Sequence, residues 1–431
     1  MMPKRCEPTV GALRGDILLA LSPMPRSLRQ GFSLLGLALL AGCTTAPATR
    51  VSLAGLPPEQ AQRAAHNLPV FNAAWDLVNR KHFDPKYQGV DWQEAGAKYG
   101  AEAAAAPDEK VFYDRLNAMV GLLRDSHTHA LTPAQAEERR TQRRPRTGFD
   151  LTRIDGQWVV SDVLPGSPAA EAGVKRGWLV VSRNGGRLGP RIAFRPREGE
   201  EAAWEFFDEN NQRVTLTLRA SQLSIAAREN RRELEGGFVY LRFDEFGRTA
   251  RRWLSRELKA HRDAPGVILD LRRNPGGETL SLSIAVGEFF DRSVDCGTFI
   301  TRGGSRSEMN SWQLGSARYR GRVVVLVDAG TASAAEIFAA VLQDHGRATI
   351  VGRKTAGAVL ASRFYRLPDG GELQLSREDY VAPLGRRIEG QGIKPDIIVP
   401  RTLDDVRRGI DPDLDVALRV LLAPEMERAA R

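Results

Sequence analysis

The chain has 431 residues, of which 42% are hydrophobic, so it is long enough for two or three domains with sizeable cores. Its formal net charge is +9, and residues 1–42 carry +3 of that charge, so the remainder is only mildly basic. Because no basic stripe is interleaved with aromatic residues, the composition argues against nucleic acid as a partner.

Residues 1–42 read as a targeting segment. Arg26 and Arg29 precede a short apolar run that ends at Gly42 and is too short to span a membrane as a helix, which is typical of a secretory signal. Met24 competes with Met1 as the natural start of the chain.

The end of that segment, Leu40-Ala41-Gly42-Cys43, resembles a bacterial lipobox. It predicts a lipid on Cys43 as the first mature residue. Thr44 after it favours an outer-membrane lipoprotein that faces the periplasm; an ordinary signal peptide with a chance cysteine is the alternative. Residues 43–58 are rich in Pro, Ala and Thr and are expected to form a tether. Removal of the segment would leave Cys296 as the only free thiol, which excludes a disulfide scaffold.

Residues 59–140 show helical periodicity and predict an N-terminal helical domain. Two apolar faces are expected, formed by Phe71, Trp75 and Val78 and by Phe112, Leu116, Met119 and Leu123. His127 and His129 follow the second helical run in a polar turn, for which a solvated loop is the simplest interpretation. A metal site would need further ligands, and no Cys or His cluster supplies them, so no cofactor is expected. The charged stretch 137–146 is expected to be a solvated linker.

Residues 147–222 show short strands with β-branched alternation, and a short helix is expected at residues 168–172. This stretch resembles a PDZ domain. The resemblance implies that Gly148-Phe149-Asp150-Leu151 forms a carboxylate-binding loop, beside which a peptide could add as a strand. Trp178 stands where the family usually has Asp, and a purely structural β-domain is the alternative.

Residues 223–431 alternate strands and helices, so we expect a largely parallel layered α/β core. Within it, the apolar run from Val323 to Val327 is typical of a buried strand, and a helix is expected from Ser333. At this strand–turn–helix junction Ser333 lies at the positive end of a helix dipole, which suits a nucleophile. Ser333-x-x-Glu336 also has the spacing of a capping box, so a plain N-cap remains an alternative.

Four separated motifs bear on Ser333, because loops at one edge of a parallel sheet converge. They are DLRRNPGG (270–277), TASAAEIFAAVLQD (331–344), GRKTAG (352–357) and IEGQGIKPD (388–396). In this order they resemble the S41 serine proteases, the tail-specific or carboxyl-terminal-processing family. The resemblance implies a multidomain α/β fold with a ClpP/crotonase-like core, Ser333 as nucleophile, and an oxyanion hole formed by the backbone N–H groups of Gly276 and Ala334.

The general base departs from the lysine-dependent branch of that family. Ala358 stands where the lysine would be, and Lys354, four residues earlier, does not match that position. Asp125-x-His127 and Glu389 instead resemble the tricorn-like branch, which implies a Ser333–His127–Glu389 triad. Glu389 would orient the imidazole directly or through a neighbour, and His129 is the competing base.

The sequence thus predicts a lipid-anchored serine endopeptidase that acts on cell-envelope proteins, unfolded chains or exposed tails, with the PDZ-like region recruiting or gating substrates. The alternatives are an inactive S41-fold lipoprotein that binds peptides or a small apolar ligand, and a scaffold that acts only through the PDZ-like region. The oligomeric state does not follow from the sequence.

Overall fold

The computed structural model describes residues 57–189, 195–314 and 318–423. The predicted signal segment, Cys43 and nearly all of the tether lie outside the described residues. No helix in the described part is long and apolar enough to cross a membrane.

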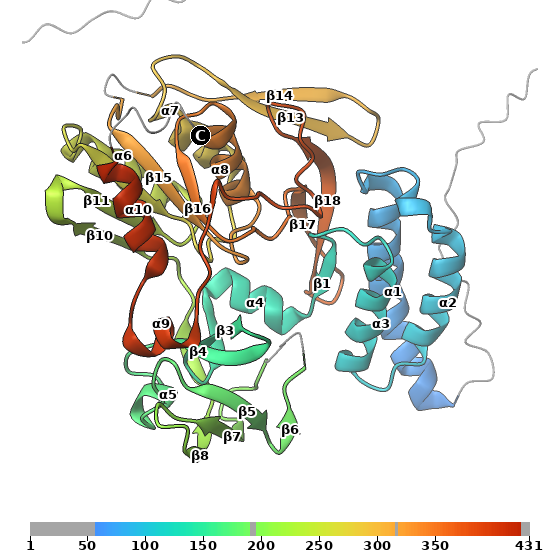
Figure 1. Cartoon of the computed structure of the whole chain (residues 1–431). Helices are drawn as coiled ribbons and strands as arrows, with labels where there is room; N and C mark the ends of the chain where they lie inside the picture. The colour runs from blue at the N-terminus through green and yellow to red at the C-terminus, as the bar shows by residue number, and fades with distance from the viewer. Residues whose placement is uncertain (1–56, 190–194, 315–317, 424–431) are drawn as a thin grey trace, which may run out of the picture. The chain divides into compact units, whose positions relative to one another are not determined.

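The N-terminal region is helical, as predicted. It contains α1 (Pro58–Lys81), the 3-10 turn η1 (Tyr87–Gly89), α2 (Trp92–Ala104) and α3 (Glu109–Gly121), which lie beside one another in Figure 1. The two predicted apolar faces are buried, with Phe71, Val78 and Leu116 fully shielded from solvent. Their core continues into Leu373 and Leu375 of a neighbouring strand, so these helices are completed by side chains from the far end of the chain.

That strand belongs to a five-stranded antiparallel sheet. Its members are β1 (His129–Leu131), β18 (Glu372–Val381), β13 (Asp295–Thr301), β14 (Arg306–Asn310) and β17 (Ala361–Arg366). A tight turn at residues 369–371 joins β17 to β18, and the Leu367 N–H donates to the Gly371 carbonyl. Strands β13 and β14 were not predicted, since β14 is mostly polar and β13 lacks a continuous apolar run.

The charged stretch 137–146 is not a solvated linker, and that prediction is wrong. It lies in α4 (Pro133–Thr141) and β2 (Arg143–Arg146), and β2 pairs with β9 (Ser221–Ser224). Thr132 and Gln135 form a capping box that starts α4. Arg139 then donates two hydrogen bonds, of 2.8 and 2.9 Å, to the mostly buried carboxylate of Glu372. The capping box is a local signal for the helix, but the pairing with Glu372 and with β9 that orders the rest of this stretch is long-range and has no local pattern.

Residues 149–219 form a small β-sheet with strand order β3-β4-β5-β7-β8, and β6 pairs with β5. Trp178, the departure from the PDZ pattern, packs against Phe206 with ring centroids 5.6 Å apart, and its indole N–H donates to Glu209. The elements are β3 (Phe149–Ile154), β4 (Gln157–Val163), α5 (Pro168–Glu171), β5 (Leu179–Arg183), β6 (Gly186–Arg187), β7 (Glu201–Phe207) and β8 (Arg213–Arg219).

The core is a six-stranded sheet with the order β10-β11-β12-β15-β16-β19, parallel from β11 to β19, which confirms the expected layered α/β arrangement. Only β10 is antiparallel to its neighbour. The strands are β10 (Glu229–Glu233), β11 (Val239–Phe243), β12 (Gly266–Asp270), β15 (Arg322–Val327), β16 (Thr349–Gly352) and β19 (Ile397–Ile398), and a 3-10 turn, η2 (Glu235–Gly237), precedes β11.

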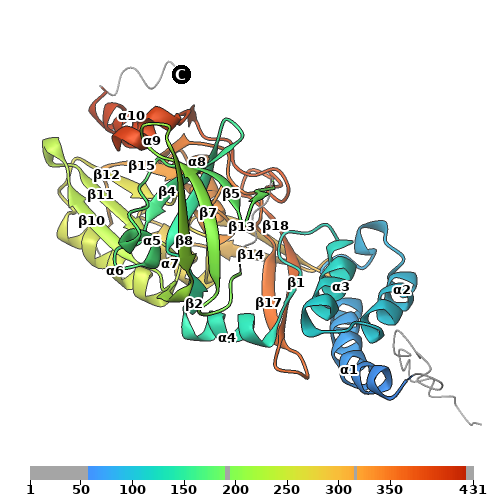
Figure 2. The ribbon, with the colours of Figure 1, turned by 90° about the horizontal axis from the view of Figure 1, so that it is seen from below.

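Helices cover both faces of this sheet (Figures 1 and 2). Alternate residues of β15 face opposite sides: Val325 belongs to one apolar cluster and Val324 to another. The first cluster includes α6 (Arg248–Ala260), α7 (Thr279–Gly287) and α8 (Ala334–Asp344), and the second includes α10 (Pro412–Leu422). A short helix, α9 (Leu403–Arg408), instead packs through Val406 against the small β-sheet.

Candidate active site

Ser333 lies between β15 and α8 with an unusual backbone conformation, φ 54° and ψ −125°. A non-glycine residue at positive φ is strained by about 1–3 kcal/mol and persists only where neighbours fix it. The neighbours here are the Ala358 carbonyl, which accepts the Ser333 N–H at 2.7 Å, and Glu336 Oε2, at 3.2 Å from the same nitrogen. The half-buried Ser333 side chain is thus held at the positive end of a helix dipole.

Glu336 does more than cap the helix, which sequence reasoning missed. Its fully buried carboxylate also accepts hydrogen bonds from the Gly357 and Ala358 N–H groups, both at 2.8 Å, and from the Thr355 hydroxyl. Burial raises the pKa of Glu336, although these donors oppose the shift. One carboxylate therefore fixes the 352–357 loop against the start of α8.

The glycine-rich loop after β12 approaches Ser333 closely. A Cβ atom added to Gly276 would lie 2.6 Å from the Ser333 Cβ and 2.7 Å from the Ala334 nitrogen, so only glycine fits. The Ala334 N–H is the first of the helix and has no intrahelical acceptor. The Gly276 N–H, however, donates to Asn274 Oδ1 at 2.9 Å, so an oxyanion would have to share or replace that acceptor.

Asp125 organises the turn that carries the histidines. Its carboxylate accepts hydrogen bonds from the backbone N–H of His127 (3.0 Å), from both the N–H and the hydroxyl of Thr128 (2.7 Å each), and from the Ser376 hydroxyl (2.9 Å). The His82 imidazole lies 2.9 Å away. Burial by itself would raise the pKa of Asp125, but the hydrogen bonds from His82 and Thr128 outweigh it and hold the pKa at about 2.

Ser126 connects the histidine to the glutamate, and sequence reasoning did not single it out. The Ser126 hydroxyl donates to Glu389 Oε2 at 3.0 Å and lies 2.7 Å from His127 Nδ1; the Ser126 N–H donates to Glu389 Oε1 at 3.1 Å. A hydroxyl has one proton. Because that proton is directed to Glu389, Nδ1 of His127 must be the donor in the other bond, which leaves Nε2 with its lone pair.

Burial lowers the pKa of His127, and Asp125 partly opposes that effect. In the described part of the chain no hydrogen bond joins the His127 imidazole to Ser333. The two are linked through one peptide unit: the Ala358 carbonyl accepts from Ser333, and the adjoining Val359 N–H donates to Glu389 Oε2 at 2.9 Å. His129 begins β1, and its Nδ1 lies 3.1 Å from the His127 carbonyl oxygen.

Lys354 is exposed, and no hydrogen bond or ion pair within residues 57–189, 195–314 and 318–423 involves its amine. Ala358, by contrast, touches the Ser333 backbone and carries no titratable group. The structure therefore places the predicted nucleophile, its glycine loop and the Ser126–His127–Glu389 chain on connected segments, and it leaves Lys354 outside that hydrogen-bonded arrangement. None of the described residues form a group of three or more side chains suited to hold a metal ion.

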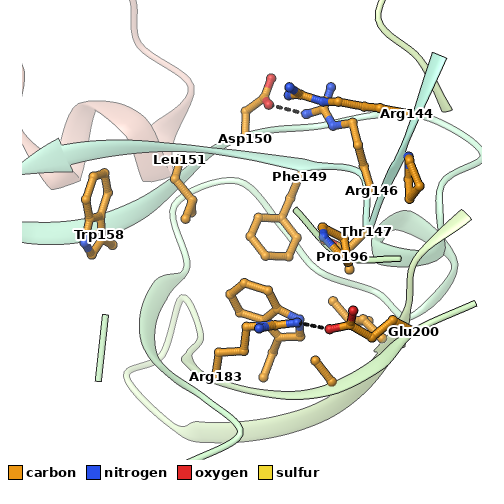
Figure 3. A pocket seen from close by; sticks show the side chains of 14 residues that line it. Arg144, Arg146, Thr147, Phe149, Asp150, Leu151, Trp158, Arg183, Pro196 and Glu200 are labelled. Carbon is orange, nitrogen blue, oxygen red and sulfur yellow. Dashed lines mark hydrogen bonds and ion pairs between the residues drawn. The ribbon is translucent and has the colours of Figure 1, made fainter. Parts of the chain in front are cut away.

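The predicted carboxylate-binding loop borders a pocket of the small β-sheet with a volume of about 350 Å³. Phe149 and Leu151 line it with apolar side chains, and Arg144 and Arg146 lie at one end (Figure 3). Asp150 at that end forms ion pairs with Arg146 and, at 2.9 Å, with Arg273 of the loop that leads to Gly276. The pocket loop and the loop beside Ser333 are thus joined by a shared carboxylate.

Comparison with known proteins bears on this geometry. Residues 237–399 match the model of peptidase family S41, and residues 64–121 match the tricorn protease C1 domain. A carboxyl-terminal-processing protease of Picosynechococcus sp. is 28% identical over 80% of this chain and 86% of its own length. The chain is a serine peptidase.

Two further matches of this peptidase are informative. A putative tricorn protease homolog 2 of Streptomyces coelicolor is 28% identical over 83% of this chain but only 32% of its own, longer chain. Among solved structures, the photosystem II D1 C-terminal processing protease superposes with a TM-score of 0.56 at 22% identity, covering 85% of this chain and 98% of that chain. The latter likeness concerns the fold alone.

Proposed function

We propose that this peptidase is an endopeptidase that cleaves peptide bonds with Ser333 as nucleophile and His127 as general base, oriented through Ser126 by Glu389. The observation that carries the proposal is the Ser126 bridge, 2.7 Å from His127 Nδ1 and 3.0 Å from Glu389. It leaves Nε2 as the proton acceptor, which is the tautomer that a base for a serine hydroxyl requires.

The reaction would begin when His127 Nε2 takes the Ser333 proton as Oγ attacks the substrate carbonyl. The negative charge that forms on the carbonyl oxygen would be stabilised by the Ala334 N–H and the adjacent glycine loop at Gly276. The His127 imidazolium would then give its proton to the leaving amine, and water would hydrolyse the acyl-enzyme by the same steps. Glu389, through Ser126, would stabilise the positive charge on the imidazole.

The small β-sheet would act as a PDZ-like module that recruits or gates substrates. Strand β3 lies at the edge of its sheet, so an extended peptide could pair with it, and the pocket beside Phe149 offers apolar walls with arginines at one end. Those features fit a chain terminus with an apolar last residue and a free carboxylate. The relatives named for carboxyl-terminal processing support the same substrate class.

We also propose that Cys43 is lipidated and holds the peptidase at the periplasmic face of the outer membrane. The lipobox-like sequence before Cys43 and the tether after it support this location. Replacement of Cys43 by serine should abolish incorporation of labelled fatty acid into the protein. Unchanged labelling of the Cys43→Ser variant would contradict the proposal.

The catalytic proposal is tested with the full chain and an unfolded protein substrate. Ser333→Ala and His127→Ala are expected to lose cleavage by at least about 1,000-fold, the scale found for members of such triads. Lys354→Ala is the matched control and should keep full activity. Loss of activity in Lys354→Ala with retention in His127→Ala would reverse the assignment of the base. Absence of cleavage by the unmodified chain would contradict the endopeptidase proposal itself.

A further inference from the structure

Helix α6 carries an exposed basic stripe that the catalytic proposal does not use. Residues 248–262 contain six basic residues and a single acidic one, Glu257. The apolar side chains at three positions of the helix are buried in the core, namely Ala250, Leu254 and Leu258. At 100° per residue the exposed residues Arg248, Arg252, Arg256 and Lys259 fall within roughly 80° on almost the opposite side of the helix.

The charges of this stripe are not neutralised inside the protein. No carboxylate of the described residues lies within ion-pair distance of Arg248, Arg252, Arg256 or Lys259. Glu257, the one acid of the helix, faces another direction, where it pairs with Arg231 at 3.6 Å and with His261 at 3.9 Å.

The positive charges at the start of α6 also lower the stability of the helix itself. Three arginines, at 248, 251 and 252, occupy its first five residues, where the helix dipole disfavours cations, and no acidic residue lies in that first turn. The nearest acid is Glu245, before the helix, whose carboxylate lies beside Gly247. Like charges four residues apart on one helix face repel. An arrangement that the folded protein does not compensate is best explained by an external anion.

We propose that the stripe of Arg248, Arg252, Arg256 and Lys259 docks the peptidase onto an anionic phospholipid surface. The four side chains project from one straight face about 17 Å long, which fits a plane of headgroups better than a groove. Figure 2 shows α6 along the β10–β12 end of the core sheet. The one aromatic residue of α6, Trp253, lies outside the stripe and packs partly buried against the core, so the stripe offers no ring on which a base could stack, which argues against single-stranded nucleic acid. The proposal rests on α6 alone and does not require the catalytic assignment or a lipid on Cys43.

The test is sedimentation of the full chain with vesicles of phosphatidylcholine or of equimolar phosphatidylcholine and phosphatidylglycerol. Each basic residue near an anionic surface contributes about fivefold in partitioning. The variant Arg248→Gln/Arg252→Gln/Arg256→Gln should therefore bind the anionic vesicles about 100-fold more weakly. Every variant keeps the same N-terminal segment, so a difference in vesicle binding between variants measures the contribution of the substituted arginines and not that of a lipid on Cys43.

Two controls make the outcome decisive. The charge-matched variant Arg306→Gln/Arg363→Gln/Arg366→Gln removes three exposed arginines from β14 and β17 and should bind like the unmodified chain. The variant Arg248→Lys/Arg252→Lys/Arg256→Lys keeps the charge and should retain binding. The proposal is overturned if the α6 glutamine variant binds as well as the unmodified chain, if both glutamine variants weaken equally, or if duplex DNA is bound more tightly than the vesicles.

Discussion

The Ser333 N–H and the Ala358 carbonyl form a 2.7 Å hydrogen bond, and this contact joins the two halves of the candidate site. The N–H on the other side of the same peptide unit, that of Val359, donates to Glu389, the residue that holds Ser126. Ala358 occupies the position at which the lysine-dependent branch would place its base. In the proposed triad its backbone, rather than its side chain, would connect the nucleophile to the glutamate that orients the histidine.

The pH dependence of cleavage should report His127. Because the base must be neutral and burial lowers the pKa of His127, kcat/KM is expected to fall on the acid side with a midpoint below 6.5. Asp125 opposes that shift, so Asp125→Asn should move the midpoint to still lower pH. A pH–rate profile of the two proteins measures both effects. An acid limb well above pH 7, or no limb, would contradict His127 as the base.

Ser126 and Glu389 should act as a unit. If Glu389 works only through Ser126, then Ser126→Ala and Glu389→Gln should each lower kcat with little change in KM, and the double variant should be no worse than the poorer single one. Steady-state kinetics of this cycle give the coupling energy. Independent, additive losses would show that Glu389 reaches His127 by another route. Ser307→Ala, an exposed serine on β14, is the control.

Asp125 should contribute stability that depends on pH. Its pKa is held at about 2 against 3.8 for a free aspartate, a shift worth about 2 kcal/mol. A carboxyl group with a lowered pKa stabilises the fold above its unfolded pKa, so this contribution is complete above about pH 4 and is lost as the pH falls toward 2. Denaturant unfolding at pH 6 and pH 3 should show the difference between Asp125→Asn and the unmodified chain shrinking at the lower pH. A constant difference would contradict this account.

Glu336→Gln should loosen the 352–357 loop. In the unmodified chain the Gly357 and Ala358 N–H groups donate to the Glu336 carboxylate. The glutamine side chain would turn its own N–H group toward one of these donors, and each buried donor left without an acceptor costs about 1–3 kcal/mol. We expect a lower free energy of unfolding and a lower kcat, because the Ala358 carbonyl would no longer be fixed against Ser333.

The sign of the pH effect separates Glu336 from Asp125. Burial raises the pKa of Glu336 above its ordinary value of 4.5, so the stability that the protonated carboxyl contributes is complete below about pH 4.5 and is lost as the pH rises through the raised pKa. The glutamine variant has no such dependence. The stability gap between the two should therefore be widest at acid pH. Glu308→Gln, at an exposed position of β14, is the matched control and should change neither stability nor kcat.

The sequence by itself determined much of the core. The apolar run at 323–327 and the helical period after Ser333 fixed a buried strand and a helix, since both patterns arise from local periodicity. Motifs such as NPGG and GRKTAG marked the loops at the sheet edge, and the absence of a lysine at Ala358 directed attention to His127. These features are properties of short segments, so they can be recognised in the sequence without knowledge of the tertiary structure.

Only the tertiary structure decided how those segments act on one another. Ser126 was indistinguishable from any loop serine until the fold brought Glu389, 263 positions later, within 3.0 Å of its hydroxyl. The charged stretch 137–146 became a helix and a strand because Glu372 and β9 supply partners that lie far away in the sequence. Hydrogen bonds between distant residues have no local signature, so this part of the site could not be derived from the sequence.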